Sequence, residues 1–132
     1  MQNTRTFGKN AAIMELKKQG FIVSRAGGDL QVGNKKVQIK CCNSDNQWAK
    51  SRNVLGGWDR IDSENFDYLI CVVFDNGFDW VRYFIFPQSE VKDFPQAVWR
   101  NARTLKNLTL IKDEERTEEI VKGSENRWDK IY

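Results

Sequence analysis

The sequence predicts a single α/β domain in which helices flank a mixed β-sheet. Three observations lead to this prediction: a helical stretch opens the chain, two short alternating runs meet at a Gly-Asn turn, and a nearly continuous apolar run follows. Elements in this order build a sheet with helices packed on its faces. The 132 residues suit one domain, and 40% apolar with 30% charged residues argue against disorder.

The first helix is expected to run from about Phe7 to Gln19. Thr6 can cap its start, because a threonine hydroxyl accepts a hydrogen bond from the free N–H groups of the first turn. Gly20 suits the position just past its end. A short strand is expected from Phe21 to Ser24, and the modest apolar stripe of the helix consists of Ala12, Ile13 and Leu16.

A β-hairpin is the most specific local prediction. Asp29 to Val32 and Lys35 to Lys40 alternate apolar and polar residues around Gly33-Asn34, which is typical of a tight hairpin turn. With the turn centred there, Asp29 lies opposite Gln38, and opposed side chains leave a sheet on the same face, about 5 Å apart. Lys40 lies two residues further along that face. The hairpin therefore gathers a carboxylate, an amide and an ammonium group.

The middle of the chain predicts a long loop followed by two strands. From Asn43 to Asn65 no periodicity is visible, and a loop of this length is usually functional when, as here, two tryptophans argue against disorder. Phe66 to Phe74 is almost entirely apolar, which favours a central strand buried on both faces. After a turn at Asp75-Asn76-Gly77, Trp80 to Phe86 is expected to return beside it and to end at Pro87.

The last third of the chain is expected to be mainly helical. A short helical piece from about Gln88 to Phe94, a helix from about Pro95 to Lys106 and an acidic helix from Asp113 to Lys122 are predicted, with a short strand at Leu108 to Ile111. The single domain, residues 1–132, would thus have a core at about 7–91 and a helical extension at about 92–132. Ile120, Val121 and Trp128 would anchor the acidic helix.

Composition excludes several kinds of chemistry. The chain has no histidine, which removes Ser-His-Asp and Cys-His nucleophilic sites and histidine-bound metals. Any metal would be held by oxygen ligands, which favours Mg²⁺, Mn²⁺ or Ca²⁺. Three cysteines form no disulfide or zinc pattern, and no apolar run is long enough to span a bilayer. We therefore expect a cytoplasmic protein without a membrane partner, and the net charge of +3 is compatible with a polyanionic one.

With these elements placed, the chain resembles the PD-(D/E)XK nuclease superfamily, the restriction-endonuclease-like enzymes. The matching residues are Glu15 on the first helix, Asp29 at a strand start and Gln38-Ile39-Lys40 on the next strand. Phe66 to Val73 resembles the following core strand. Tyr83 to Pro87 is similar to the strand ending of the small single-domain homing and restriction branch. The resemblance covers roughly residues 7–91. The family usually has Asp or Glu where this chain has Gln38.

The resemblance implies a role for each matching residue in Mg²⁺-dependent phosphodiester hydrolysis, with Mn²⁺ as a substitute. Asp29 would be the primary metal ligand, the Gln38 amide a second oxygen donor and the Ile39 carbonyl a third. Lys40 would orient or deprotonate the attacking water, or stabilise the pentavalent phosphate. Glu15 would bind the metal or its water shell. Because Gln38 carries no charge, metal affinity is expected to be lower than in relatives with a carboxylate there.

The expected function is that of an endonuclease acting on duplex DNA, of restriction, homing or junction-resolving type. One domain carries one site, so cutting both strands implies a homo-oligomer, a dimer or tetramer. Cationic, amide and indole side chains are the types that contact phosphates and bases. The candidates for DNA binding are Trp48, Lys50, Arg52, Asn53 and Trp58 in the long loop, and Arg100, Arg103 and Lys106 along one predicted helix.

Other interpretations of these residues stay open. Asp29 after two glycines also suits a plain turn, Gln38 and Lys40 a solvated hairpin face, and Glu15 a surface helix position. Trp58 also suits a residue that packs on the core, and the basic helix a solvated surface. At the level of function, the alternatives are a catalytically inactive nucleic-acid-binding module on the same fold, and an interaction protein that works through its tryptophans and acidic tail.

Overall fold

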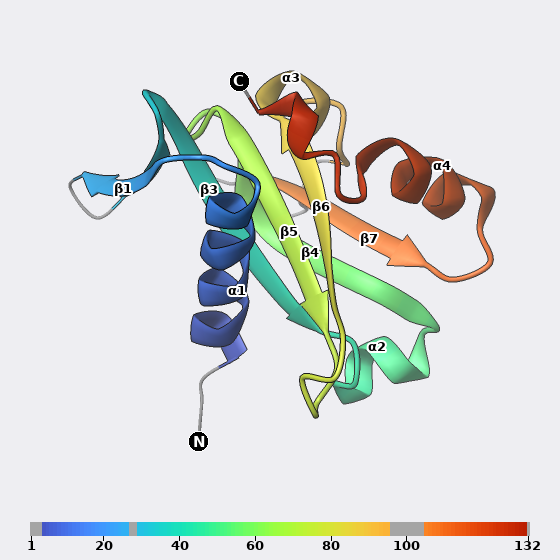
Figure 1. Ribbon diagram of the computed structural model, residues 1–132. Helices are drawn as coiled ribbons and strands as arrows, with labels where there is room; N and C mark the ends of the chain where they lie inside the picture. The colour runs from blue at the N-terminus through green and yellow to red at the C-terminus, as the bar shows by residue number, and fades with distance from the viewer. Residues whose placement is uncertain (1–3, 27–28, 96–104, 132) are drawn as a thin grey trace.

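A five-stranded mixed sheet forms the centre of the computed structural model (Figure 1). The structure describes residues 4–26, 29–95 and 105–131. The strands lie in the order β1-β2-β3-β5-β6; β3 and β5 are parallel, and the other neighbours are antiparallel. The strands are β1 Val23–Ala26, β2 Asp29–Val32, β3 Lys35–Asn43, β5 Tyr68–Phe74 and β6 Val81–Pro87.

A second sheet of two antiparallel strands, β4 Val54–Asp62 and β7 Leu105–Ile111, packs against one face of the first. The prediction of a loop from Asn43 to Asn65 is therefore wrong, because this segment contains β4 and the short helix α2 Gln47–Ser51. The strand predicted at Leu108 to Ile111 is confirmed, and it begins earlier, at Leu105. Lys106 lies in β7 and not in a helix, whereas Arg100 and Arg103 lie outside the described residues.

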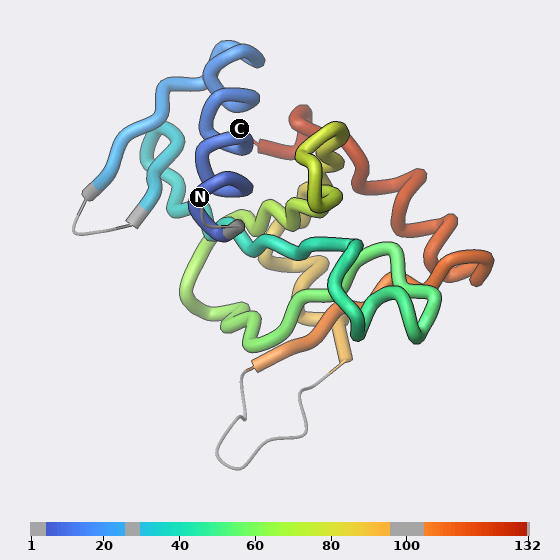
Figure 2. Tube along the Cα trace, turned by 90° about the horizontal axis from the view of Figure 1, so that it is seen from below, coloured from blue at the N-terminus to red at the C-terminus, as the bar shows by residue number. Residues whose placement is uncertain are grey.

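The two faces of the central sheet are covered by different elements. Helix α1 Thr4–Lys18 lies on one face, and β4 with β7 lies on the other, as the view along the sheet shows (Figure 2). Thr6 lies inside α1 and does not cap it, while Gly20 follows its end in the left-handed conformation, with φ at 96°. The remaining helical elements are α3 Gln88–Val91, α4 Glu115–Ser124 and the 3₁₀ turn η1 Trp128–Lys130. None of the helices in the described part of the chain has the length and apolar character needed to cross a membrane.

Two apolar cores lie on either side of β5, which explains why all seven residues of this strand are buried. Leu16 of α1 packs with Val37 and Ile70 on one side. Trp58 of β4 packs with Leu69 and Phe84 on the other, where Ile120 and Val121 of α4 join it. The two expected anchors of α4 are thus confirmed, whereas Trp128 belongs to η1 and packs in the α1-side core.

The predicted hairpin has the predicted register. Leu30 pairs with Val37, and Val32 with Lys35, around a turn in which Gly33 has a φ of 63°. Among the described residues, β2 pairs with β3 only as far as Val37, but β3 continues to Asn43 along β5. The second half of β3 therefore has β5 on one side and an edge not paired with β2 on the other. This edge borders the candidate site.

Gly8 allows α1 to approach this half of β3 closely. A Cβ atom at position 8 would overlap the Cys41 sulfur and lie 3.1 Å from the Phe74 ring. We expect Gly8→Ala to lower the free energy of unfolding by about 1–3 kcal/mol, because overpacking a filled contact displaces the helix. Urea unfolding measures this change. Gly123→Ala in α4 is the matched control, since no atom lies within 4 Å of its added Cβ; it should be neutral or slightly stabilising. Equal effects at the two glycines would contradict the close-packing argument.

Candidate functional site

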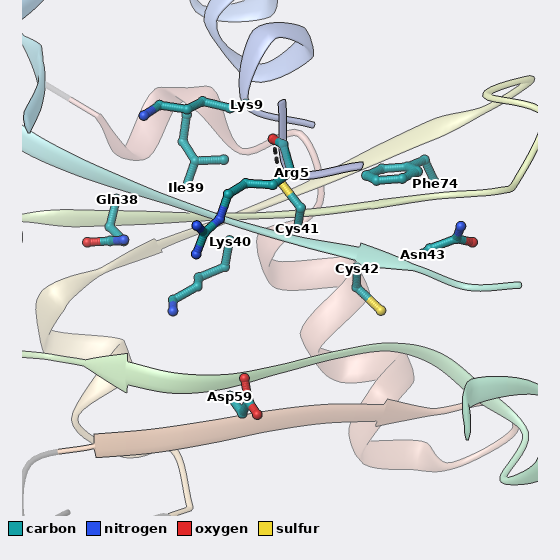
Figure 3. Close-up of a pocket in the computed structure, with 10 residues that line it drawn as sticks. All are labelled: Arg5, Lys9, Gln38, Ile39, Lys40, Cys41, Cys42, Asn43, Asp59 and Phe74. Carbon is teal, nitrogen blue, oxygen red and sulfur yellow. Dashed lines mark hydrogen bonds between the residues drawn. The ribbon is translucent and has the colours of Figure 1, made fainter. Parts of the chain in front are cut away.

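A cavity of about 340 Å³ lies beside the second half of β3, between the start of α1 and β4 (Figure 3). The backbone of α1 is held to the strand here, because the Cys41 thiol donates to the Arg5 carbonyl at 3.6 Å. The lining residues come from three separate elements and the end of β5. They are Arg5, Lys9, Gln38, Ile39, Lys40, Cys41, Cys42, Asn43, Asp59 and Phe74.

Alternation along β3 decides which side chains face which layer. The side chains of Val37, Ile39 and Cys41 pack in the core on the α1 side of the sheet. Cys42 packs in the other core, between the central sheet and β4. Gln38 and Lys40 therefore share the face of Cys42, as Figure 3 shows for Lys40, which points from β3 toward β4. The sequence placed Gln38 and Lys40 together on one hairpin face, and the structure has them so.

The peptide groups of β3 alternate between the two strand edges in the same way. The Lys36 carbonyl accepts from Asp67 N at 2.8 Å, and Ser44 N donates to the Phe74 carbonyl at 2.9 Å, so even-numbered residues direct their backbone toward β5. Ile39 consequently directs its carbonyl toward the other edge, where the cavity lies. This oxygen is a hard donor of the kind that Mg²⁺ accepts.

Cationic side chains dominate the cavity. Lys40 from β3 and Arg5 and Lys9 from α1 stand around it, and Asp59 of β4 is the single carboxylate among the described lining residues. Such a cluster suits a phosphate group better than a neutral or cationic ligand, because charge-assisted hydrogen bonds from cations to phosphate oxygens are strong. Arg5, Lys9 and Asp59 were not singled out from the sequence.

Glu15 does not lie in this cavity, contrary to expectation. Its carboxylate accepts from Gln19 Nε2 at 3.2 Å, and it lies close enough to Tyr83 of β6 to reinforce the effect of burial in raising the pKa of that phenol. Since β5 separates β6 from β3, Glu15 stands over the far part of the sheet. The reason is the rotation of α1, which turns Arg5 and Lys9 to the cavity instead.

The described part of the site supplies oxygen donors but few charges for a metal. Asp29 begins β2 and pairs through its backbone with Ala26, and its side chain is outside what the structure describes. The described residues contain no group of three or more His, Cys, Asp or Glu that could hold a metal ion. The Gln38 amide, the Ile39 carbonyl and the Asp59 carboxylate fit a hard cation such as Mg²⁺ by donor type.

Asp59 reaches the cavity because of a β-bulge. Between the pairs Trp58–Leu108 and Ile61–Lys106, two residues of β4 oppose one residue of β7, and Arg60 has a φ of 51°. A bulge re-aims a side chain in this way and occurs often beside functional sites. In Figure 3 Asp59 points from β4 toward β3. Because the bulge adds a residue, the sequence of β4 does not alternate regularly, and the segment was therefore predicted as a loop.

The cysteines around the cavity are not nucleophiles. Burial raises the pKa of Cys41 to about 11, although the positive charge of Arg5 acts in the opposite direction. Burial likewise raises the pKa of Cys42, and a thiol that stays protonated at neutral pH attacks poorly.

A second cavity, of about 690 Å³, adjoins the first and shares Cys41, Cys42, Asn43 and Asp59 with it. Trp48 of α2 lines it and is 42% exposed. The Arg52 guanidinium lies 5.7 Å from the centre of the Trp48 ring. Of the other residues expected to bind DNA, Lys50 and Asn53 are exposed, and Asn53 donates to the Lys112 carbonyl.

Trp58 is not available to stack on a base. Its side chain is only 4% exposed, and its indole N–H donates to the Val72 carbonyl at 3.2 Å, which connects the second sheet to the first. The alternative in which Trp58 packs on the core is thus the one that the structure shows. Burial of both the ring and its polar atom is typical of a structural tryptophan.

The architecture is that of the restriction-endonuclease-like α/β class. The chain is similar to a solved structure described as a bacterial homing endonuclease, I-Ssp6803I, with a TM-score of 0.54 and 18% sequence identity. The match covers 88% of this chain and 80% of the other. The predicted fold class is thereby confirmed. No protein-family profile matches the chain, and no curated protein matches its sequence.

Proposed function

We propose that the protein is a Mg²⁺-dependent endonuclease that hydrolyses phosphodiester bonds in DNA. The observation that carries this proposal is one cavity lined by Gln38, Ile39 and Lys40 of β3 and by the cations Arg5 and Lys9 of α1. The fold around it is similar to that of a homing endonuclease. A DNA phosphate placed there would have its charge balanced by three cations from two elements. The hydrolysis of a phosphodiester needs this electrostatic stabilisation more than any other single contribution.

The residues divide the work by chemistry. Asp29, the Gln38 amide and the Ile39 carbonyl would hold the metal, whose bound form polarises the phosphate and lowers the pKa of a water. Lys40 would orient the attacking water and stabilise the negative charge that develops on the phosphate oxygens. Arg5 and Lys9 would bind the neighbouring phosphate oxygens and thereby position the DNA strand in the site. Lys50, Arg52, Arg100, Arg103 and Lys106 would contact phosphates further along the DNA.

The test is cleavage of a plasmid library with random inserts, followed by sequencing of the ends produced. We expect nicks or breaks with Mg²⁺ or Mn²⁺ and none in EDTA, because the bound metal would polarise the phosphate and lower the pKa of the attacking water. Undiminished cutting in EDTA would contradict the proposal. Cutting of both strands further requires two sites, so we propose a homo-oligomer, which light scattering of the DNA complex checks.

A second candidate is a module that binds DNA without cutting it. Gln38 favours this candidate, because it removes a negative charge from the metal site, and Asp59 is the single described carboxylate in the cavity. The two candidates differ in one assay. The non-catalytic module would bind the plasmid library in EDTA and leave it intact in Mg²⁺.

A further inference from the structure

We propose that the second cavity is a binding pocket for one unpaired nucleobase of the DNA, next to the phosphate held in the first cavity. This inference rests on the proposed function, since it takes the first cavity to hold a phosphate. At about 690 Å³, the second cavity lies within the range of about 300–1,000 Å³ that small-molecule sites have. The two cavities share lining residues, so one nucleotide can extend from the first into the second.

Trp48 gives the pocket an aromatic wall. Its ring is exposed and lies close against Gly57, because its Cη2 and Cζ3 atoms are 2.9 Å from where a Cβ of residue 57 would be. Arg52 lies over the same ring and brings a cation to its side. An indole with a guanidinium nearby matches a base and the phosphate attached to it.

Asn107 gives the pocket a hydrogen-bonding group that awaits a partner. Its Oδ1 atom has almost no exposed surface and has no hydrogen bond among the described residues. The neighbouring amides are engaged differently: Asn43 bonds to Asn76 and to Asp45 N, and Asn46 accepts from Ala49 N to cap α2. Buried polar atoms are almost always paired, and Asn107 lines the cavity, so a rotation of its side chain would let a ligand N–H donor satisfy this acceptor.

The bulge in β4 lies directly opposite Asn107. Asn107 is the β7 residue that faces the extra residue of the bulge, between the pairs Trp58–Leu108 and Ile61–Lys106. Asp59, in the bulge, lines both cavities, and Asn107 lines the second one. A flat ligand with N–H donors on its edge, attached to a phosphate, fits this combination of groups. A nucleobase has these properties, and it enters such a pocket only when unpaired.

Fluorescence anisotropy in EDTA tests the proposal with a labelled oligodeoxycytidylate and an abasic oligonucleotide of equal length. We expect the wild type to prefer the base-bearing strand. Trp48→Ala should weaken that binding about tenfold and leave abasic binding unchanged, and Trp48→Phe should restore most of it. Asn107→Ala should weaken it about two- to tenfold. Trp80→Ala is the matched control, since Trp80 is 39% exposed but lines neither cavity.

Two results would overturn the pocket assignment: equal affinity of the wild type for both strands, or a loss in Trp48→Ala that is the same for both. Trp80→Ala matching Trp48→Ala would overturn it as well. The plasmid assay separates this failure from failure of the proposed function. Cutting without base-dependent binding would reject the base pocket and support the nuclease function. Base-dependent binding without cutting would support the base pocket and reject the nuclease function.

Discussion

Replacement of Lys40 by alanine is expected to lower the DNA cleavage rate by a factor of about 10²–10⁴, the range for loss of a proton-transfer or charge-stabilising group. Lys40 comes from the strand that also carries Gln38 and Ile39, and it points into the space toward β4. The Arg5 and Lys9 cations can still attract the phosphate, so affinity for DNA should change far less than the rate. Single-turnover cleavage and binding in EDTA measure the two quantities separately.

Lys122→Ala is the matched control for this experiment, because Lys122 is exposed on α4 and lines neither cavity. Asp29→Ala is expected to abolish cutting in the same way, through loss of the proposed primary metal ligand. Wild-type rates in both Lys40→Ala and Asp29→Ala would contradict the assignment of the site. A parallel fall in rate and affinity in Lys40→Ala would instead indicate a residue that only binds DNA.

Replacement of Trp58 by alanine is expected to lower the free energy of unfolding by about 3–5 kcal/mol, the cost of removing a buried aromatic ring. The ring packs on Phe84 at 6.0 Å between centroids, and its N–H bonds to β5. Without it, the second sheet loses a hydrogen bond and a ring contact to the first. Trp58→Phe keeps much of the apolar surface but removes the hydrogen bond to the Val72 carbonyl, so an intermediate loss is expected.

Urea unfolding of the two Trp58 variants measures these losses. Trp80→Ala provides the comparison, because an exposed substitution usually changes stability by no more than about 0.5 kcal/mol. If Trp58→Ala were as stable as Trp80→Ala, the description of Trp58 as the connection between the sheets would be wrong. A stable Trp58→Ala that lost DNA affinity would return this residue to the group expected to contact bases.

The parts of the fold that the sequence predicted well depend on neighbouring residues. Gly33-Asn34 and the alternation around it determine the hairpin register locally, and the apolar run around Ile70 has few alternatives to a buried strand. β4 was missed and β7 was predicted only from Leu108 onward, because the two strands pair with each other across more than forty residues. The bulge at Asp59 also interrupts the period of two in β4. No local pattern reports a partner that far along the chain.

The candidate site shows the same division. Gln38, Ile39 and Lys40 lie on one strand, so their spacing along the chain is enough to determine their relative positions. Arg5, Lys9 and Asp59 reach the cavity only through packing of α1 and β4 on the sheet. Glu15 was placed wrongly because the rotation of a helix with a modest apolar stripe depends on close contacts such as that of Gly8 with Cys41.

The uneven lengths of β2 and β3 also affect how copies of the protein meet one another in solution. An unpaired strand edge is a template for intermolecular β-pairing, which leads to aggregation. The unpaired edge of β3 includes Lys40 and lies near Arg5 and Lys9. Two molecules that paired through this edge would therefore bring like charges together. The positive charge suited to a nucleic-acid backbone therefore also helps to keep the protein dispersed.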